Sequence, residues 1–206
     1  AHGMAPEKFV YVPNGIDPDE WRSDPVAALP AAHRAAIAES RAAGRLLVAY
    51  AGAHGLANAL DTVLDAAALT RGDPVDWLLI GNGPEQQRLR TRAAAEALTN
   101  VRLLDPVPKA SIPALLAAMD VLYIGLQREP LFRFGISPNK LMDYMMAARP
   151  IVCAIDAGND PVGTAHCGVT IPPQDPAALA AAVRRFIPMP ATERRALGDA
   201  GRRYVE

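Results

Sequence analysis

Residues 46–55 read LLVAYAGAHG, an apolar run that ends in a loop with glycine at positions 52 and 55. A short apolar run bounded by turn residues is typical of a buried strand. Residues 57–70 follow directly and have alanine and leucine at helical spacing. This stretch therefore predicts a strand, a tight glycine loop and a helix, which is the building unit of a parallel sheet.

The same unit recurs along the chain, with short apolar runs separated by longer amphipathic ones. It predicts an α/β fold, a Rossmann-like doubly wound parallel sheet that forms a single domain over residues 1–206. The predicted strands are residues 10–12, 46–50, 76–80, 101–104, 120–125, 151–155 and 169–171. The predicted helices are residues 26–43, 57–70, 84–98, 111–119, 138–148 and 175–186, and an Arg-rich helical pattern reaches the last residue.

Composition narrows the range of functions. The formal net charge is −1 and only 5% of residues are aromatic, so neither a basic stripe nor a stacking surface for nucleic acid is indicated. No apolar run approaches the length of a membrane span, and we expect a cytoplasmic protein. Arginines near the C-terminus favour a solvated helix face over a membrane patch. Cys153 and Cys167 lack metal-ligand spacing and are expected to be buried small residues.

Ligands of an open parallel sheet bind outside the carboxyl ends of its strands, so the loops after the strands are the candidate sites. Gly52 and Gly55 let a backbone approach a phosphate closely, and the following helix offers free N–H groups. His54 between them is a candidate donor to phosphate or sugar. The same residues also fit an ordinary strand-to-helix turn, and they do not form a P-loop or a GxGxxG motif.

Two further loops carry weaker signals. Gly81, Asn82 and Gly83 again permit close approach, although they also suit a tight turn before a helix. Val107 follows the next strand in a loop whose composition alone indicates nothing more.

The most informative loop lies before residue 150. Ser137 and Pro138 predict an N-cap with proline in the first helical position. Asn139 and Lys140 follow in the first turn, where a lysine opposes the helix dipole unless an anion binds there. Asp143 shares the face of Lys140 and can accept hydrogen bonds from the hydroxyls of a ribose. A capped surface helix with a Lys–Asp pair explains the same residues equally well.

Together these elements resemble the C-terminal domain of the GT4 glycosyltransferases, which are retaining enzymes of the GT-B fold. The resemblance covers nearly the whole chain and keeps the family's order. The matching stretches are VPNGID at residues 12–17, YAGAHGLANALDTVLDA at 50–66, LIGNGP at 79–84, IPALLAAMDV at 112–121, SPNKLMDYMMAARPIV at 137–152 and GVTIPPQDPAAL at 168–179. The fifth of these is especially similar to bacterial UDP-N-acetylfucosamine-type transferases of O-antigen and capsule synthesis.

The resemblance implies a UDP-sugar donor and no other cofactor. The fifth stretch implies that the sugar is N-acetylated. It places the diphosphate between the His54–Gly55 loop and residues 137–140, the ribose at Asp143 and the uracil near Val107. Lys140 and His54 become the candidate catalytic residues, and the glycine loops join the donor-binding set. Since no metal-binding motif is assigned, transfer is expected to be metal-independent.

The resemblance also implies partners outside these residues. The chain opens and closes in mid-pattern, so we expect a fragment of a two-domain enzyme whose N-terminal acceptor domain is missing and which is inactive alone. The full-length enzyme is expected to act in lipopolysaccharide or surface polysaccharide synthesis, with peripheral contact at the inner face of the bacterial membrane.

Two departures from the family pattern concern the site. The family carries a Glu-x7-Glu pair, whereas here Gly135 stands eight residues before Asp143, which leaves the sugar undefined. Many members also have Lys-Gly in the first helix, where this chain has Ala57-Asn58-Ala59, so Lys140 is expected to carry more of the phosphate charge.

Three other functions stay open at this point. A UDP-sugar 2-epimerase shares the GT-B fold but requires acid and base residues that are not found in the expected places. A non-catalytic nucleotide-binding module needs no transfer chemistry. A Rossmann dehydrogenase requires GxGxxG after the first strand, which is absent.

Overall fold

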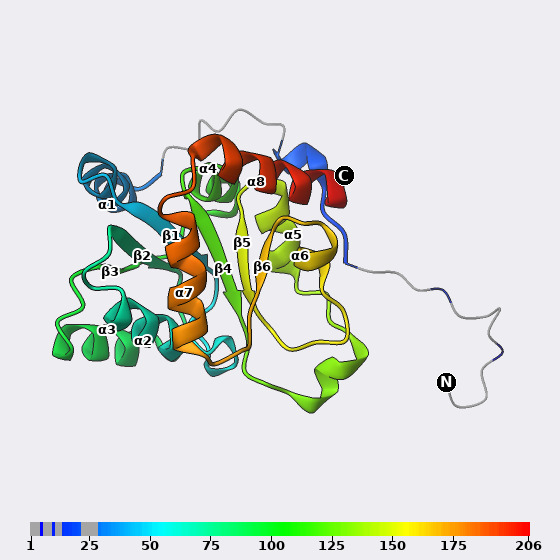
Figure 1. Ribbon diagram of the computed structural model, residues 1–206, viewed down its shortest axis with the longest axis horizontal. Helices are drawn as coiled ribbons and strands as arrows, with labels where there is room; N and C mark the ends of the chain where they lie inside the picture. Colours follow the sequence, from blue (N-terminus) through cyan, green and yellow to red (C-terminus); the bar gives the residue numbers. More distant parts are fainter. Residues whose placement is uncertain (1–4, 6–9, 11–13, 22–28) are drawn as a thin grey trace.

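Six parallel strands form one sheet, with the order β3-β2-β1-β4-β5-β6 (Figure 1). The computed structural model describes residues 5, 10, 14–21 and 29–206. The predicted doubly wound parallel sheet is confirmed, and each strand lies within one residue of a predicted one. The strands are β1 (Leu46–Ala51), β2 (Val75–Ile80), β3 (Val101–Leu104), β4 (Val121–Gly125), β5 (Ile151–Ala154) and β6 (Gly168–Thr170).

The strand order reverses between β1 and β4. The chain first adds β2 and β3 on one side of β1, and then returns to place β4 on its other side, where Val48 pairs with Val121. Such a switch point opens a crevice at the carboxyl ends of the strands, because the two connections leave in opposite directions. The candidate loops therefore meet at the place where this fold binds ligands.

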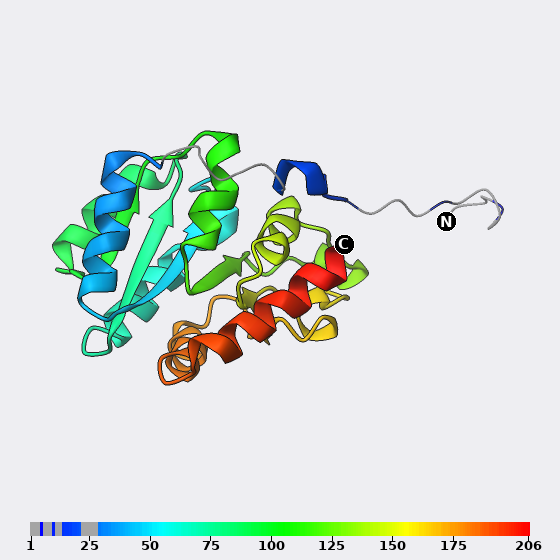
Figure 2. The same cartoon turned by 90° about the horizontal axis from the view of Figure 1, so that it is seen from above.

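Alternating residues of the strands form two cores, one on each face of the sheet. Val48, Tyr50 and Trp77 lie in the first core with α2, α3 and α7, and Leu47, Ala49 and Leu78 lie in the second with α1, α4 and α5. Figure 2 shows α1, α4 and α5 on one side of the sheet and α7 on the other. The helices are α1 (Ala31–Ala42), α2 (Asp61–Leu69), α3 (Gln86–Ala95), α4 (Ile112–Ala117), α5 (Asn139–Met146), α6 (Pro161–Thr164), α7 (Pro176–Phe186) and α8 (Ala191–Val205).

The helix α8 lies at the top of Figure 1 and starts beside the amino ends of the strands, and its last residues, Tyr204 and Val205, line a pocket with Ser137 and Pro138. Its Leu197 packs against the first core and its Val205 against the second. Arg194 lies 3.5 Å from Asp120, the residue before β4, and Arg202 donates to Met146 O at 2.9 Å. Arg194 and Arg202 therefore fasten the helix to the domain, whereas Arg195 pairs with Asp199 within α8.

Some predicted elements lie outside the described residues, and others differ from the structure. The predicted strand at residues 10–12 lies outside the described residues except for Val10, which is exposed and has no regular structure. Residues 22–28, which include the start of the predicted helix 26–43, also lie outside them. A 3-10 turn, η3 (Leu56–Asn58), precedes α2 where one continuous helix was predicted. The short η2 (Pro18–Trp21), η4 (Lys109–Ser111), η5 (Pro130–Phe134) and α6 were not predicted.

Candidate functional site

The two glycine loops lie side by side at the carboxyl ends of β1 and β2. Gly52 N donates to Ile80 O at 2.9 Å, and His54 N donates to Asn82 O at 2.7 Å, so the ladder between the strands continues into the loops. Gly81 N in turn donates to Leu104 O at 3.0 Å. The structure thus brings the first two predicted loops together and holds their backbones in a fixed relation.

A tyrosine fastens α5 to the end of β1. Tyr144 Oη accepts a hydrogen bond from Ala51 N at 2.8 Å and lies 3.2 Å from Ala51 O. Residues four apart share a face of a helix, so this contact also turns Lys140 toward the same strand end. The buried Leu141 and Met145 pack the helix into the second core.

Lys140 extends from α5 across the end of β1. Its Nζ lies 2.6 Å from Tyr50 Oη, 3.4 Å from Asn58 Oδ1 and 4.0 Å from the centre of the Tyr50 ring. A methyl group added at Gly52 would lie 2.7 Å from Nζ, so the lysine occupies the space that a side chain at position 52 would need. The glycine at this position therefore admits the lysine into the loop.

The ammonium group of Lys140 is a cation without a carboxylate partner among the described residues, since both of its hydrogen-bond partners are neutral. Burial lowers the pKa of Lys140 from 10.5 to about 8, because the charged form loses hydration. A buried cation without a counter-charge is costly, and an anionic ligand is the simplest compensation. Lys140, which was predicted to need an anion, thus lies in an environment that an anionic ligand would stabilise.

His54 lies deeper than the sequence suggested. His54 is 0% exposed, and neither nitrogen of its ring has a hydrogen-bond partner among the described residues. Burial lowers its pKa, and the charges of Arg90 and Lys140 lower it further, so the imidazole is neutral at pH 7. In this conformation the loop presents backbone, and not the His54 ring, to solvent.

Asp143 lines a second part of the site, one helical turn beyond Lys140. A cavity of about 420 Å³ is bounded by Asp143, Lys109, Ile112, Pro113 and Trp21 among others. Burial and the nearby charge of Glu20 raise the pKa of Asp143, whereas Lys109 lowers it. The cavity therefore combines Asp143 and the Lys109–Glu20 ion pair with apolar walls, a mixture typical of ligand pockets.

The start of α5 differs from the prediction. The helix begins at Asn139 with Pro138 as its N-cap, and no side chain caps it, so the predicted cap by Ser137 was wrong. Pro138 has an extended backbone (φ −70°, ψ 124°), which moves the helix start one residue along the chain. Ser137 instead accepts a hydrogen bond at its carbonyl oxygen from Asn14 Nδ2, at 2.5 Å. The first N–H groups of the helix therefore have no side-chain cap.

Gly135 adopts a φ of 94°, which favours glycine over any other residue. A methyl group there would lie 3.1 Å from Asn159 Oδ1. Asn159 uses both ends of its amide on Ile136, accepting from its N–H at 2.8 Å and donating to its carbonyl at 2.9 Å. Asn159 therefore fixes the loop before α5. This loop contains Gly135, the position at which the family has the first glutamate of its Glu-x7-Glu pair.

Neither a cluster of metal-ligand residues nor a long apolar helix occurs in the part of the chain that the structure describes. No cluster of three His, Cys, Asp or Glu residues there has the geometry of a metal site. The triplet Asp17-Pro18-Asp19 closes a turn instead, with Asp17 Oδ1 accepting from Asp19 N at 2.9 Å. None of the described helices has the length and apolar character of a membrane span. Cys153 and Cys167 are buried as predicted, and burial raises their pKa values to about 12 and about 11.

A family model for the glycosyl transferases group 1 matches residues 28–188, which is more than half of the chain. The chain belongs to this family. A Pseudomonas aeruginosa protein described as probable glycosyltransferase WbjE is 26% identical over 140 residues, which cover 66% of this chain and 34% of that protein. The chain therefore spans about a third of the length of this relative.

Solved structures show the same fold. Anabaena HepE in complex with UDP superposes with a TM-score of 0.71 at 20% identity, over 93% of this chain and 51% of that one. WaaG, a glycosyltransferase involved in lipopolysaccharide biosynthesis, gives a TM-score of 0.69 at 20% identity, over 98% and 53%. The group 1 domain described here is thus about half the length of these chains, and its fold is that of a GT-B domain.

Sequence reasoning missed four residues of this group 1 site. Tyr50 and Asn58 contact Lys140, Lys109 lines the cavity beside Asp143, and Asn159 holds the loop around Gly135. Tyr50 was predicted only as the last residue of a buried strand, with no sign that its hydroxyl group contacts Lys140. The place of Asn58, where the family often has lysine, was the one available signal.

Proposed function

We propose that this group 1 domain binds the UDP part of a UDP-sugar and serves as the donor half of a retaining, metal-independent glycosyltransferase. The observation that carries the proposal is the Lys140 ammonium, which is partly buried beside two glycine loops and has no carboxylate partner among the described residues. The UDP-bound relatives of the same fold support UDP as the nucleotide.

The diphosphate would lie between the backbone of the loop after β1 and the start of α5. Lys140 would donate to its oxygens, and the uncapped N–H groups at Asn139 and Lys140 would add the positive end of the helix dipole. When the bond between the anomeric carbon and the UDP oxygen breaks, negative charge grows on the leaving diphosphate. These groups would stabilise that charge, which is the main electrostatic contribution to such a transfer.

The ribose and the base would occupy the cavity beside Asp143. A carboxylate accepts hydrogen bonds from both ribose hydroxyls, and the apolar atoms of Ile112 and Pro113 suit a uracil ring. Val107, from the preceding loop, is partly buried against the second core, and the uracil would lie near it. Asp143→Asn should weaken UDP binding with little loss of stability, because Asp143 has no ion pair with a described residue to lose.

The sugar and the acceptor need more than this domain. Without an acid at Gly135, recognition of an N-acetylated sugar would come from other groups, and the similarity of residues 137–152 to N-acetylfucosamine transferases supports that sugar class. A second domain would supply the acceptor site, in keeping with the length of the solved relatives. We therefore expect residues 1–206 to bind UDP without transferring sugar, and to act within lipopolysaccharide or surface polysaccharide synthesis only in the whole enzyme.

A thermal-shift series with UDP, GDP and ADP tests the proposal. UDP should raise the melting temperature of residues 1–206 in a saturable way, since a ligand that binds only the folded state stabilises it by mass action. GDP and ADP should have a clearly smaller effect, because the proposal assigns the cavity beside Asp143 to a uracil ring. Equal shifts by all three nucleotides, or none by UDP, would contradict a UDP-specific site.

A further inference from the structure

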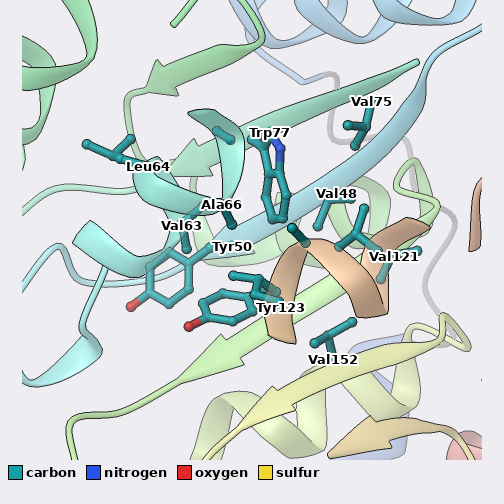
Figure 3. Packing of buried hydrophobic residues seen from close by; sticks show 14 of the residues in the cluster. Val48, Tyr50, Val63, Leu64, Ala66, Val75, Trp77, Val121, Tyr123 and Val152 are labelled. Atoms are coloured by element: carbon teal, nitrogen blue, oxygen red, sulfur yellow. The ribbon is translucent and has the colours of Figure 1, made fainter. Parts of the chain in front are cut away.

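The hydroxyl group of Tyr50 reaches from the core to the functional edge of the sheet. The ring of Tyr50 packs in the first core beside Tyr123, and Figure 3 shows both hydroxyl groups pointing the same way. Tyr50 Oη donates to Ala53 O at 2.7 Å. Because its single hydrogen is used there, the oxygen can only accept from Lys140 Nζ, which lies 2.6 Å away.

The contact joins residues from opposite faces of the sheet. Lys140 belongs to α5, which packs in the second core, whereas Tyr50 belongs to the first. The side chain of Lys140 can meet Tyr50 only by passing over the end of β1, where Gly52 leaves the space free. The ammonium is thereby held at the carboxyl edge, 4.0 Å from the ring centre.

Resting on the proposed UDP site, we propose that Tyr50 is the positioning residue for Lys140, and that its hydroxyl group and ring hold the ammonium over Gly52 where a nucleotide diphosphate binds. The holder is neutral, which matters for function. A carboxylate in its place would hold the lysine more firmly but would compete with the diphosphate for the same cation.

The side chains that surround the Lys140 ammonium are uncharged. Burial raises the pKa of Tyr50 well above its usual range, so the phenol stays protonated. His54, from the loop after β1, has a lowered pKa and is uncharged at pH 7, and Asn58 from η3 is neutral. Asp143 lies one turn away on α5 itself, in a separate cavity. Lys140 Nζ donates a hydrogen bond to Tyr50 Oη, and a hydrogen bond to the charged form of a group favours that form.

The chain contains three lysines, Lys8, Lys109 and Lys140, so a pH titration of [13C]lysine-labelled protein by NMR can follow each one. Lys140→Ala assigns the signal. We expect Tyr50→Phe to lower the pKa of Lys140 and to weaken UDP binding about 3- to 10-fold by calorimetry, the value of one hydrogen bond. Tyr123→Phe is the matched control, because Tyr123 lies in the same core but its hydroxyl has no described partner. It should change neither quantity.

The outcomes separate the inference from the proposed function. If the wild type binds UDP, Lys140→Ala loses it, and Tyr50→Phe behaves like Tyr123→Phe, the positioning role is overturned and the UDP site stands. If the wild type does not bind UDP, both are overturned. Should Tyr50→Phe fail to fold, Asn58→Asp tests whether Lys140 must be held by uncharged residues. A carboxylate at position 58 should raise the pKa of Lys140 and weaken UDP binding. A lower pKa or tighter binding in Asn58→Asp would contradict it.

Discussion

Lys140 is the residue whose environment decides the chemistry of this edge of the sheet. Its pKa of about 8 means that the fraction of charged lysine changes within the range in which binding can be measured. A diphosphate binds the charged form, so the affinity for UDP should be highest below pH 8 and fall as the pH rises toward 9.5. Calorimetric titration with UDP from pH 7 to pH 9.5 measures this fall.

Lys140→Arg is the control for that pH dependence. A guanidinium keeps its charge throughout this range, so whatever affinity the variant retains should not vary between pH 7 and pH 9.5. The same decline in both proteins would assign the effect to another group and would count against Lys140.

The same pKa bears on the stability of the fold. The pKa of Lys140 is lower in the folded chain than the 10.5 of an exposed lysine, so the unfolded chain binds more protons between these values. The free energy of unfolding of the wild type should therefore rise, relative to Lys140→Met, as the pH increases from 8 to 10.5. Urea denaturation of both proteins at several pH values tests this. A difference that stays constant with pH would contradict the lowered pKa.

Gly52 gives a second prediction at this scale. Gly52→Ala places a methyl group 2.7 Å from Lys140 Nζ at a φ of 152°, so the lysine must move and the backbone is strained. We expect weaker UDP binding together with a lower melting temperature. Gly44→Ala is the matched control, because its φ is 65° but nothing lies near the added methyl group. Gly44→Ala should lower the melting temperature and leave UDP affinity unchanged. Equal UDP affinity in the wild type, Gly52→Ala and Gly44→Ala would show that the added methyl group does not displace Lys140.

At the scale of elements, the aspartate in the family-like stretch at residues 168–179 has a structural role at the start of a helix. Asp175 is the N-cap of α7, and its carboxylate accepts from Ala178 N at 2.8 Å. Asp175→Ala should lower the free energy of unfolding by about 1 kcal/mol and leave UDP affinity unchanged, since the residue caps a helix and contacts no part of the site. Asp175→Ser should keep most of the stability, because serine also caps. A loss of UDP binding in either variant would assign Asp175 to the site.

The start of α5 shows how far local sequence rules extend. Ser137-Pro138 is a good capping pair by composition, yet the helix begins one residue later without a side-chain cap. Two long-range contacts to this segment, from Asn14 to Ser137 and from Asn159 to Ile136, fix its backbone, and neither can be deduced from neighbouring residues. The residue types were predicted correctly, and their geometry depended on segments far along the chain.

At the scale of the whole molecule, the alternation of apolar runs was sufficient to predict the parallel sheet. Strands such as β1 and β2 are buried on both faces and have no competing interpretation. The short helical turns and the exact helix starts were not predictable, because they depend on loop packing and not on periodicity. The edge strand β6 has three residues, two of them only partly buried, so its bounds were the least certain.

The site was predictable where it is made of backbone and a charged side chain. Gly52, Gly81 and Lys140 follow from the rule that ligands bind at the carboxyl ends of parallel strands. Tyr50, Asn58 and Asn159 were missed because each acts through a contact between elements that are distant in sequence. The burial of His54 was missed for the same reason, since the loop after β2 covers it.

Calorimetry of residues 1–206 with UDP at pH 7 shows whether Lys140 binds the diphosphate of a UDP-sugar. Lys140→Ala should weaken binding on the order of 10- to 100-fold, the value of a charged hydrogen bond in a partly buried site. Arg184 lies on α7, away from Lys140, and pairs with Asp73. Arg184→Ala should therefore bind UDP like the wild type. Equal affinity of the wild type and Lys140→Ala for UDP would contradict the account.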